Sequence, residues 1–156
     1  MFESKKVIIV GPSGTGKTTI KMVFFEMGNP LKLLNIGLEP TRGINSKIFS
    51  FFDISLGVFD LAGQENENWF KSDKKVFNNA NVIICVLDVN AYLKEVLDFI
   101  RDLINIYGEL KLSNCIIAIL LHKIDLIDKL LLHHKLKTIH DFLKKLNNGD
   151  IELMIY

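Results

Sequence analysis

The chain has 156 residues, a length that suits one domain rather than two. Hydrophobic residues make up 49% of it and charged residues 24%, an ordinary globular mixture that excludes a disordered acidic or basic tail. The formal net charge of +1 gives no electrostatic basis for nucleic-acid binding, and two cysteines exclude a disulfide scaffold.

The first apolar run, Val7 to Val10, predicts a buried strand and is too short for a signal-peptide core or a membrane span. Ile20, Val23, Phe24 and Met27 then recur at the spacing of one helix face. We therefore expect a strand, a loop and an amphipathic helix at the start of the chain, and no direct membrane anchor.

Residues 30–46 show no clean period and contain two prolines and two glycines, so they are predicted to form a long, functional loop. Residues 48–52 and 54–59 predict two strands that turn near Asp53. The segment 62–68 is polar and is predicted to be irregular.

The second half repeats the alternation of apolar runs and helical stripes. Residues 82–87 and 115–121 predict buried strands, residues 93–107 carry a strong helical stripe, and residues 151–156 predict a last strand. A further helical stripe is made of Leu132, Leu136, Ile139, Leu143 and Leu146. This order predicts an α/β fold with a mostly parallel sheet, whose ligands bind at the carboxyl ends of the strands.

Both cysteines, Cys85 and Cys115, lie in apolar runs, where a reduced and buried thiol is expected. A cytoplasmic location is the corresponding expectation. Any contact with a membrane is expected to come through a partner.

The segment Gly11-Pro12-Ser13-Gly14-Thr15-Gly16-Lys17-Thr18 matches the phosphate-loop pattern G-x-x-x-x-G-K-[ST] at every fixed position. Glycines let such a loop curl so that backbone N–H groups point at a phosphate, and the next helix adds its positive N-terminal end. Lys17 is expected to contact the outer phosphates, and the Thr18 hydroxyl suits a Mg²⁺ ligand. Because the match lies between a predicted strand and a predicted helix, these residues and Thr19 are predicted to bind nucleotide phosphates.

A second motif, Asp60-Leu61-Ala62-Gly63-Gln64, follows the strand predicted to end at Phe59. A carboxylate at Asp60 can hold a Mg²⁺-bound water, the Gly63 N–H can meet a γ-phosphate, and Gln64 can orient an attacking water. Taken alone the pattern is weak, because a plain turn after a strand has the same form.

A third motif, His122-Lys123-Ile124-Asp125-Leu126, follows the strand predicted at residues 115–121. The Asp125 carboxylate can accept two hydrogen bonds from guanine, whereas adenine would leave it unpaired. The stem of Lys123 is expected to lie along the base plane. The motif predicts a guanine-binding loop made of His122, Lys123, Asp125 and Leu126, and a solvated loop with one ion pair is the alternative.

In this order and at these separations, the motifs resemble those of the small GTPases of the Ras superfamily over nearly the whole chain. Pro40-Thr41 and the D-x-x-G-Q motif are similar to those of Arf-like and Rag/Gtr-type GTPases. His122, where an Asn usually ties the base loop to the phosphate loop, is more like the Rag/Gtr type.

The resemblance implies a single G domain over residues 1–156 with the three-layer P-loop NTPase fold and helices on both sheet faces. Thr41 would be the Mg²⁺ ligand of the first switch loop, beside Thr18 and Asp60, and residues 63–77 would be the second switch. Lys17, Thr41 and Gln64 would be the catalytic residues.

Two segments that the family normally has are missing from this sequence: a guanine loop with a final helix, and the roadblock-like dimerisation domain of Rag/Gtr proteins. We expect a partner, either a second copy of the chain or another polypeptide, to cover the sheet face that a missing final helix would expose. The partners that the resemblance implies include a second GTPase or a roadblock- or longin-type protein. A shortened form of a longer protein is the alternative.

The implied function is a molecular switch that binds GTP or GDP with Mg²⁺, hydrolyses GTP slowly, and acts on regulatory and effector proteins. Slow hydrolysis is expected because Arg42 is interpreted as a solvated residue rather than an arginine finger. Trp69 and Phe70 are either effector contacts or core residues. A non-hydrolysing scaffold or a subunit of a heteromeric GTPase complex stays open, whereas a kinase is disfavoured because Arg42 and Arg101 are the only arginines.

Overall fold

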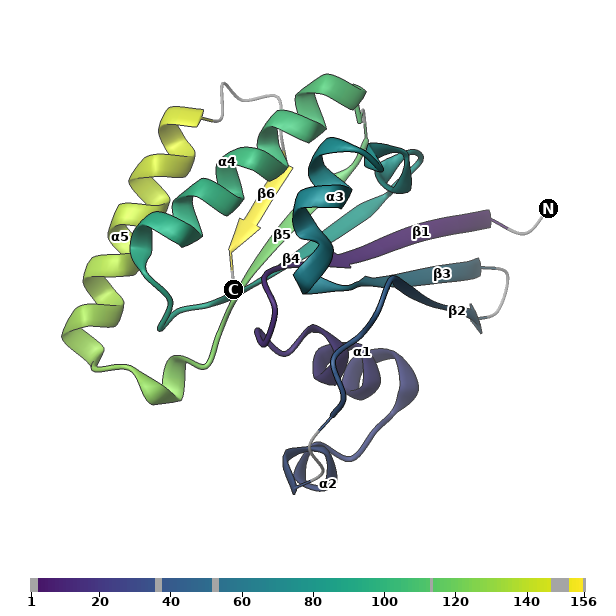
Figure 1. The fold of residues 1–156 in the computed structure, drawn as a ribbon, viewed down its shortest axis with the longest axis horizontal. Helices are drawn as coiled ribbons and strands as arrows, with labels where there is room; N and C mark the ends of the chain where they lie inside the picture. The colour runs from purple at the N-terminus through teal and green to yellow at the C-terminus, as the bar shows by residue number, and fades with distance from the viewer. Residues whose placement is uncertain (1–2, 36–37, 52–53, 113, 147–151, 156) are drawn as a thin grey trace.

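The structure is a computed structural model that describes residues 3–35, 38–51, 54–112, 114–146 and 152–155. Within these residues a six-stranded sheet has the strand order β2-β3-β1-β4-β5-β6 (Figure 1). All neighbouring strands are parallel except β2, which pairs antiparallel with β3. The predicted α/β fold with a mostly parallel sheet is therefore confirmed.

The elements occur along the chain in the following order. The first are β1 (Glu3–Val10), α1 (Lys17–Glu26), α2 (Pro30–Asn35), β2 (Ile44–Phe51) and β3 (Ile54–Leu61). A 3₁₀ turn η1 (Gly63–Glu65), α3 (Asn66–Lys71), a second 3₁₀ turn η2 (Lys74–Phe77), β4 (Val82–Asp88) and α4 (Leu93–Leu110) follow. The last are β5 (Ile116–His122), the 3₁₀ turn η3 (Ile124–Leu126), α5 (Lys129–Leu146) and β6 (Glu152–Ile155).

Each predicted strand coincides with an observed strand, and the predicted turn at Asp53 lies outside the described residues. The larger core joins one face of the sheet, mainly of β4 and β5, to α3, α4 and α5, and Phe77, Ile100 and Leu103 are among its largest fully buried side chains. A smaller core joins α1, through Ile20 and Phe25, to the other face of β1 and β3. Helices thus lie on both faces of the sheet (Figure 1), which suits the continuous apolar runs of β4 and β5.

The face of α1 that packs inward differs in part from the predicted one, of which Ile20 does pack in the smaller core. Phe24 and Met27 are 71% and 81% exposed, whereas Lys21 is 3% exposed and Phe25 packs on the Phe49 ring at 6.0 Å. Residues four apart share a helix face, so the helix that points Lys17 into the phosphate loop also points Lys21 and Phe25 inward. The side of α1 that packs inward therefore follows from the direction of Lys17 into the phosphate loop, rather than from the number of apolar residues on each side of the helix.

Two segments predicted to lack regular structure contain helices. The interval 30–46 includes α2 and the first residues of β2, and the interval 62–68 includes η1 and the start of α3. The side-chain oxygen of Asn29 accepts hydrogen bonds from the N–H groups of Leu31 and Lys32, at 3.0 and 3.3 Å. Asn29-Pro30 therefore caps and begins a short helix, as well as ending α1.

On α5 the inward face contains Lys135 rather than the predicted Leu136. Leu136 is 38% exposed, whereas Lys135 is 9% exposed and its Nζ donates to the carbonyls of Val89 and Ala91 at 2.7 and 2.8 Å. The carbonyls of the β4–α4 loop need donors when they are buried, and Lys135 supplies them.

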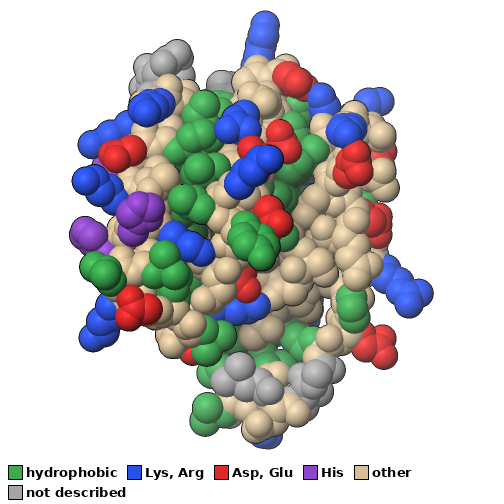
Figure 2. Space-filling view, turned by 60° about the vertical axis from the view of Figure 1, so that its left-hand side comes forward, with side chains coloured by type: hydrophobic (Ala, Val, Ile, Leu, Met, Phe, Trp, Pro, Cys, Tyr) green, Lys and Arg blue, Asp and Glu red, His purple; other side chains and the backbone are tan. Residues whose placement is uncertain are grey.

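Cys85 and Cys115 are both buried free thiols, as predicted, and burial raises the pKa of Cys115 to about 11. On the face shown in Figure 2, lysine and arginine side chains are interspersed with acidic ones. Among the described residues, no helix combines the length and the apolar character needed to cross a bilayer.

Candidate functional site

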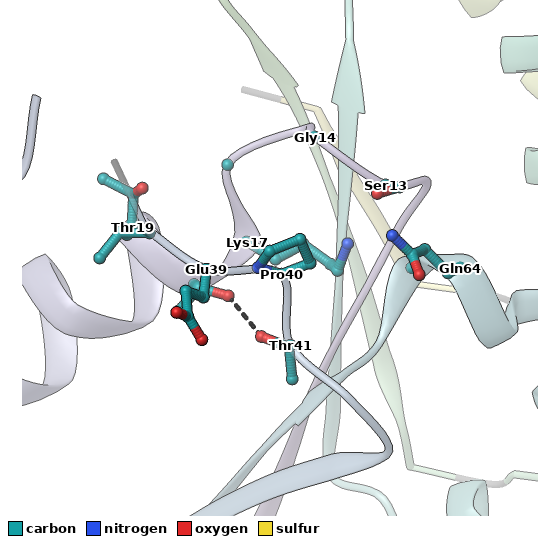
Figure 3. A pocket seen from close by; sticks show the side chains of 12 residues that line it. Ser13, Gly14, Lys17, Thr19, Glu39, Pro40, Thr41 and Gln64 are labelled. Carbon is teal, nitrogen blue, oxygen red and sulfur yellow. Dashed lines mark hydrogen bonds between the residues drawn. The ribbon is translucent and has the colours of Figure 1, made fainter. Parts of the chain in front are cut away.

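A cavity of about 260 Å³ lies over the phosphate loop, next to the carboxyl ends of β1 and β3 (Figure 3). Three segments form its walls: the phosphate loop with the start of α1, the segment before β2, and the turn after β3. The residues that line it are Ser13, Gly14, Gly16, Lys17, Thr18, Thr19, Leu38, Glu39, Pro40, Thr41, Gly63 and Gln64.

Three oxygen-bearing side chains meet beside this cavity. The hydroxyls of Thr18 and Thr41 lie 2.8 Å apart, and Thr18 donates to Oδ2 of Asp60 at 2.8 Å. Thr41 approaches the same carboxylate oxygen at 3.4 Å. The structure therefore brings together the three predicted metal ligands, which come from α1, the segment before β2, and β3.

The chemistry of this cluster suits a hard divalent cation. Every donor is an oxygen, and Oδ1 of Asp60 is buried without a hydrogen-bond partner. In the part of the chain that the structure describes, no group of three or more His, Cys, Asp or Glu residues could hold a metal. Hydroxyls with a single carboxylate fit Mg²⁺, which keeps several waters and phosphate oxygens as its other ligands.

Opposite charges are buried side by side at the base of the site. Burial lowers the pKa of Lys17, although the Asp60 carboxylate opposes that shift. Burial also raises the pKa of Asp60, against the Thr18 hydrogen bond and the charges of Lys17 and Lys21. For both groups, desolvation by burial outweighs the attraction between the two charges.

The phosphate loop has the curled form that its glycines predict. Lys17 Nζ donates to the Pro12 carbonyl at 2.8 Å, and Thr15 Oγ1 donates to the same carbonyl at 3.0 Å. Gly16 has φ of 93°, and a Cβ there would lie 2.8 Å from the His122 ring. Only glycine meets both conditions at this position.

His122 links the base loop to the phosphate loop. Its Nδ1 lies 2.9 Å from the Thr15 carbonyl oxygen. Because a carbonyl only accepts hydrogen bonds, Nδ1 carries the proton in this contact. The tie that the family resemblance assigns to an Asn is therefore made here by the imidazole.

The rest of the base loop lies at the surface beyond the end of β5. Lys123 donates to Oδ2 of Asp88 at 2.7 Å, and its carbonyl accepts from Asn90 at 3.1 Å. Burial pushes the pKa of Asp88 upward, but the hydrogen bonds from Lys123 and Asn90 hold it below its ordinary value. Asp125 and Leu126 are exposed on η3 and do not line the cavity, so their predicted contact with a base stays a prediction.

The exposure of Arg42, Trp69 and Phe70 bears on the alternative roles that the sequence left for them. Arg42 is exposed and does not line the cavity, as expected of a solvated residue. Trp69 is 6% exposed and donates through Nε1 to the Ala62 carbonyl at 3.0 Å. Phe70 packs on the rings of Phe77 and Phe99. Trp69 is therefore a core residue, and Phe70 is half-buried against the same core.

Some residues of the site were not predicted. Leu38 and Glu39 line the cavity, and their place just before Pro40-Thr41 was the only available signal. Lys135 supports the base loop indirectly, because the β4–α4 loop that it holds contains Asn90 and follows Asp88. Asn66 donates to the Gly11 carbonyl at 2.9 Å and belongs to no motif.

Comparison with known proteins places this geometry in a family. Residues 6–154 match the Gtr1/RagA G protein conserved region. The chain is 29% identical over 134 residues to the GTP-binding protein gtr1 of Schizosaccharomyces pombe, covering 80% of the chain and 41% of that protein. It is 29% identical over 129 residues to the GTP-binding protein GTR1 of Saccharomyces cerevisiae, covering 79% of the chain and 40% of that protein.

Proposed function

Because the chain belongs to the Gtr1/RagA G protein family, we propose that it is a guanine-nucleotide-binding switch that hydrolyses GTP slowly to GDP and phosphate. The observation that carries this proposal is the meeting of Thr18, Thr41 and Asp60 at the cavity lined by Lys17 and Gln64. The chain spans about two fifths of the length of these relatives, 41% and 40%. The activity and the partners given for this chain are therefore proposals.

In this proposal each side chain has a defined task. Lys17 and the N–H groups of the phosphate loop stabilise negative charge on the phosphates. Thr18, Thr41 and Asp60 hold Mg²⁺, which when bound would neutralise charge on the outer phosphate oxygens. Gln64, which lines the same cavity, orients the attacking water.

The base loop supplies the choice of nucleotide. Asp125 accepts the two hydrogen bonds that guanine offers, and Lys123, held by Asp88, lies along the base. His122 joins this loop to the phosphate loop, so the two halves of the nucleotide site are fixed relative to one another.

We also propose a setting for the switch, which rests on the family resemblance. Its partners are regulatory and effector proteins, including a second GTPase or a roadblock- or longin-type protein. Residues 1–156 form one G domain, and its location is cytoplasmic with recruitment to membranes through partners. Because Arg42 is exposed and lies outside the cavity lining, fast hydrolysis requires a group that a partner supplies.

The first experiment identifies the nucleotide carried by the purified chain. The chain is denatured, and anion-exchange chromatography separates and counts the released nucleotide. We expect GDP or GTP near one per chain and slow single-turnover hydrolysis that needs Mg²⁺ and is lost in Gln64→Leu. Binding without hydrolysis would favour a scaffold instead, and failure to bind either nucleotide with Mg²⁺ would reject the proposal.

The substitution Asp125→Asn tests the proposed base contact. An amide can donate to the 2-oxo group of xanthine but cannot accept both guanine hydrogen bonds. We expect preference to move from GDP to xanthosine diphosphate, by about tenfold or more for each base, since a polar mismatch costs at least about 1.4 kcal/mol. Competition binding measures both affinities, with Asp128→Asn of the same loop region as control. An unchanged preference would contradict the assignment.

A further inference from the structure

The turn that carries Gly63 and Gln64 lies directly on the phosphate loop. A Cβ built on Gly63 would lie 2.6 Å from Lys17 Nζ, 2.6 Å from the Ser13 nitrogen and 2.7 Å from the Pro12 carbonyl carbon. Figure 3 shows Ser13, Lys17 and Gln64 around the cavity that all three line. The turn therefore reaches the groups that would surround a third phosphate.

Asn66 fastens this turn to the phosphate loop. Its amide nitrogen donates to the Gly11 carbonyl at 2.9 Å and to the Gly63 carbonyl at 2.7 Å. Its Oδ1 is buried without a hydrogen-bond partner. Burying that unpaired oxygen is unfavourable, a cost that the two hydrogen bonds donated to the loop carbonyls offset.

Glu65 fastens the same turn to the Thr41 segment. Its carboxylate accepts a hydrogen bond from the Gly43 N–H at 2.8 Å, and the Ala62 N–H donates to the Gly43 carbonyl at 2.9 Å. Gly43 lies two residues after Thr41. Two neighbouring side chains thus reach to the two loops on either side of the Gln64 turn.

We propose that Glu65 and Asn66 are positioning residues that couple the Thr41 segment, the Gln64 turn and the phosphate loop, so that a guanosine triphosphate is distinguished from a diphosphate. This inference rests on the proposed function. A diphosphate reaches Lys17 and Thr18, whereas a third phosphate also meets Gly63 and Thr41. Holding those residues in place beforehand lowers the ordering cost of binding the triphosphate and aligns Gln64 for the water.

The test compares Asn66→Ala and Glu65→Ala with matched controls on α3. Asn68→Ala and Glu67→Ala remove the same side-chain types from exposed positions, where Glu67 pairs only with Lys71 in the hydrogen bonds and ion pairs described. For each variant of the full chain, the Kd for GDP and for a non-hydrolysable GTP analogue and the single-turnover hydrolysis rate are measured with Mg²⁺.

We expect the GDP Kd to stay within about twofold of the unmodified chain in both test variants. The Kd for the GTP analogue should rise by about 3- to 10-fold, the effect of one net hydrogen bond, and hydrolysis should slow by at least as much. The double variant should lose less than the product of the single effects, because the two ties hold one turn. The controls should behave as the unmodified chain.

Conservative variants separate positioning from a structural role. Glu65→Gln keeps a carbonyl oxygen for the Gly43 N–H and should retain the GTP-analogue affinity. Asn66→Asp loses both donors and sets a carboxylate against two carbonyl oxygens, so it should lose at least as much GTP-analogue affinity as Asn66→Ala. Equal loss of GDP and GTP-analogue affinity, or identical behaviour of Asn66→Ala and Asn68→Ala, would overturn the inference alone. An unmodified chain that binds neither nucleotide would overturn the proposed function as well.

Discussion

Replacing Asp60 by Asn is expected to stabilise the nucleotide-free chain while it weakens Mg²⁺-dependent nucleotide binding. Asp60 is 0% exposed, its Oδ1 has no hydrogen-bond partner, and burial raises its pKa. That raised pKa already includes the attraction of Lys17 and Lys21, so the cost of burying the charge exceeds their contribution. A neutral amide of the same shape can still accept the Thr18 hydrogen bond through its oxygen.

The stabilisation should be about 1–3 kcal/mol, because the amide removes a desolvated negative charge, although its nitrogen takes the unpartnered position of Oδ1. Urea unfolding of the nucleotide-free chain measures it, with the exposed Asp102→Asn as a control that should change stability by less than about 0.5 kcal/mol. GDP affinity with and without Mg²⁺ measures the loss of function. A less stable Asp60→Asn chain, or one whose GDP binding still responds fully to Mg²⁺, would argue against a site held ready for a cation.

The second large effect is expected from Lys17→Ala. Lys17 is 6% exposed, its Nζ donates to the Pro12 carbonyl, and its side chain lies between the phosphate loop and Gly63. In a buried site its ammonium would pair with the outer phosphates, and truncating one partner of a buried charge pair costs about 2–5 kcal/mol. GDP affinity should therefore fall roughly 30- to 5,000-fold.

Isothermal titration or fluorescent-nucleotide displacement gives the affinity of this variant. Lys71→Ala is a suitable control, because Lys71 is exposed on α3 and pairs with Glu67. Unfolding curves of the nucleotide-free chains show whether Lys17→Ala still folds. A folded Lys17→Ala chain that binds GDP as the unmodified chain does would remove the phosphate loop from the nucleotide site.

The phosphate loop and the strands could be predicted because their signals are local. The loop depends on glycines and a lysine at fixed spacing, and the buried strands are continuous apolar runs such as 82–87. The members of the oxygen cluster could be predicted because Thr18 belongs to the phosphate-loop motif, Asp60 follows a predicted strand, and the resemblance to small GTPases implied Thr41. The distances between them required the fold.

Other features depend on contacts between segments far apart in the chain. The inward rotation of α1 follows from the direction of Lys17, and the burial of Lys135 follows from carbonyls on the β4–α4 loop 46 and 44 residues away. Asn66 reaches a carbonyl 55 residues away, and no periodicity records such a partner. The fold class, the phosphate loop and the residue types of the site therefore follow from spacing and polarity along the chain. The polar side chains that tie the loops together could be identified only from the fold, because those bonds depend on which distant backbone groups the packing leaves without partners.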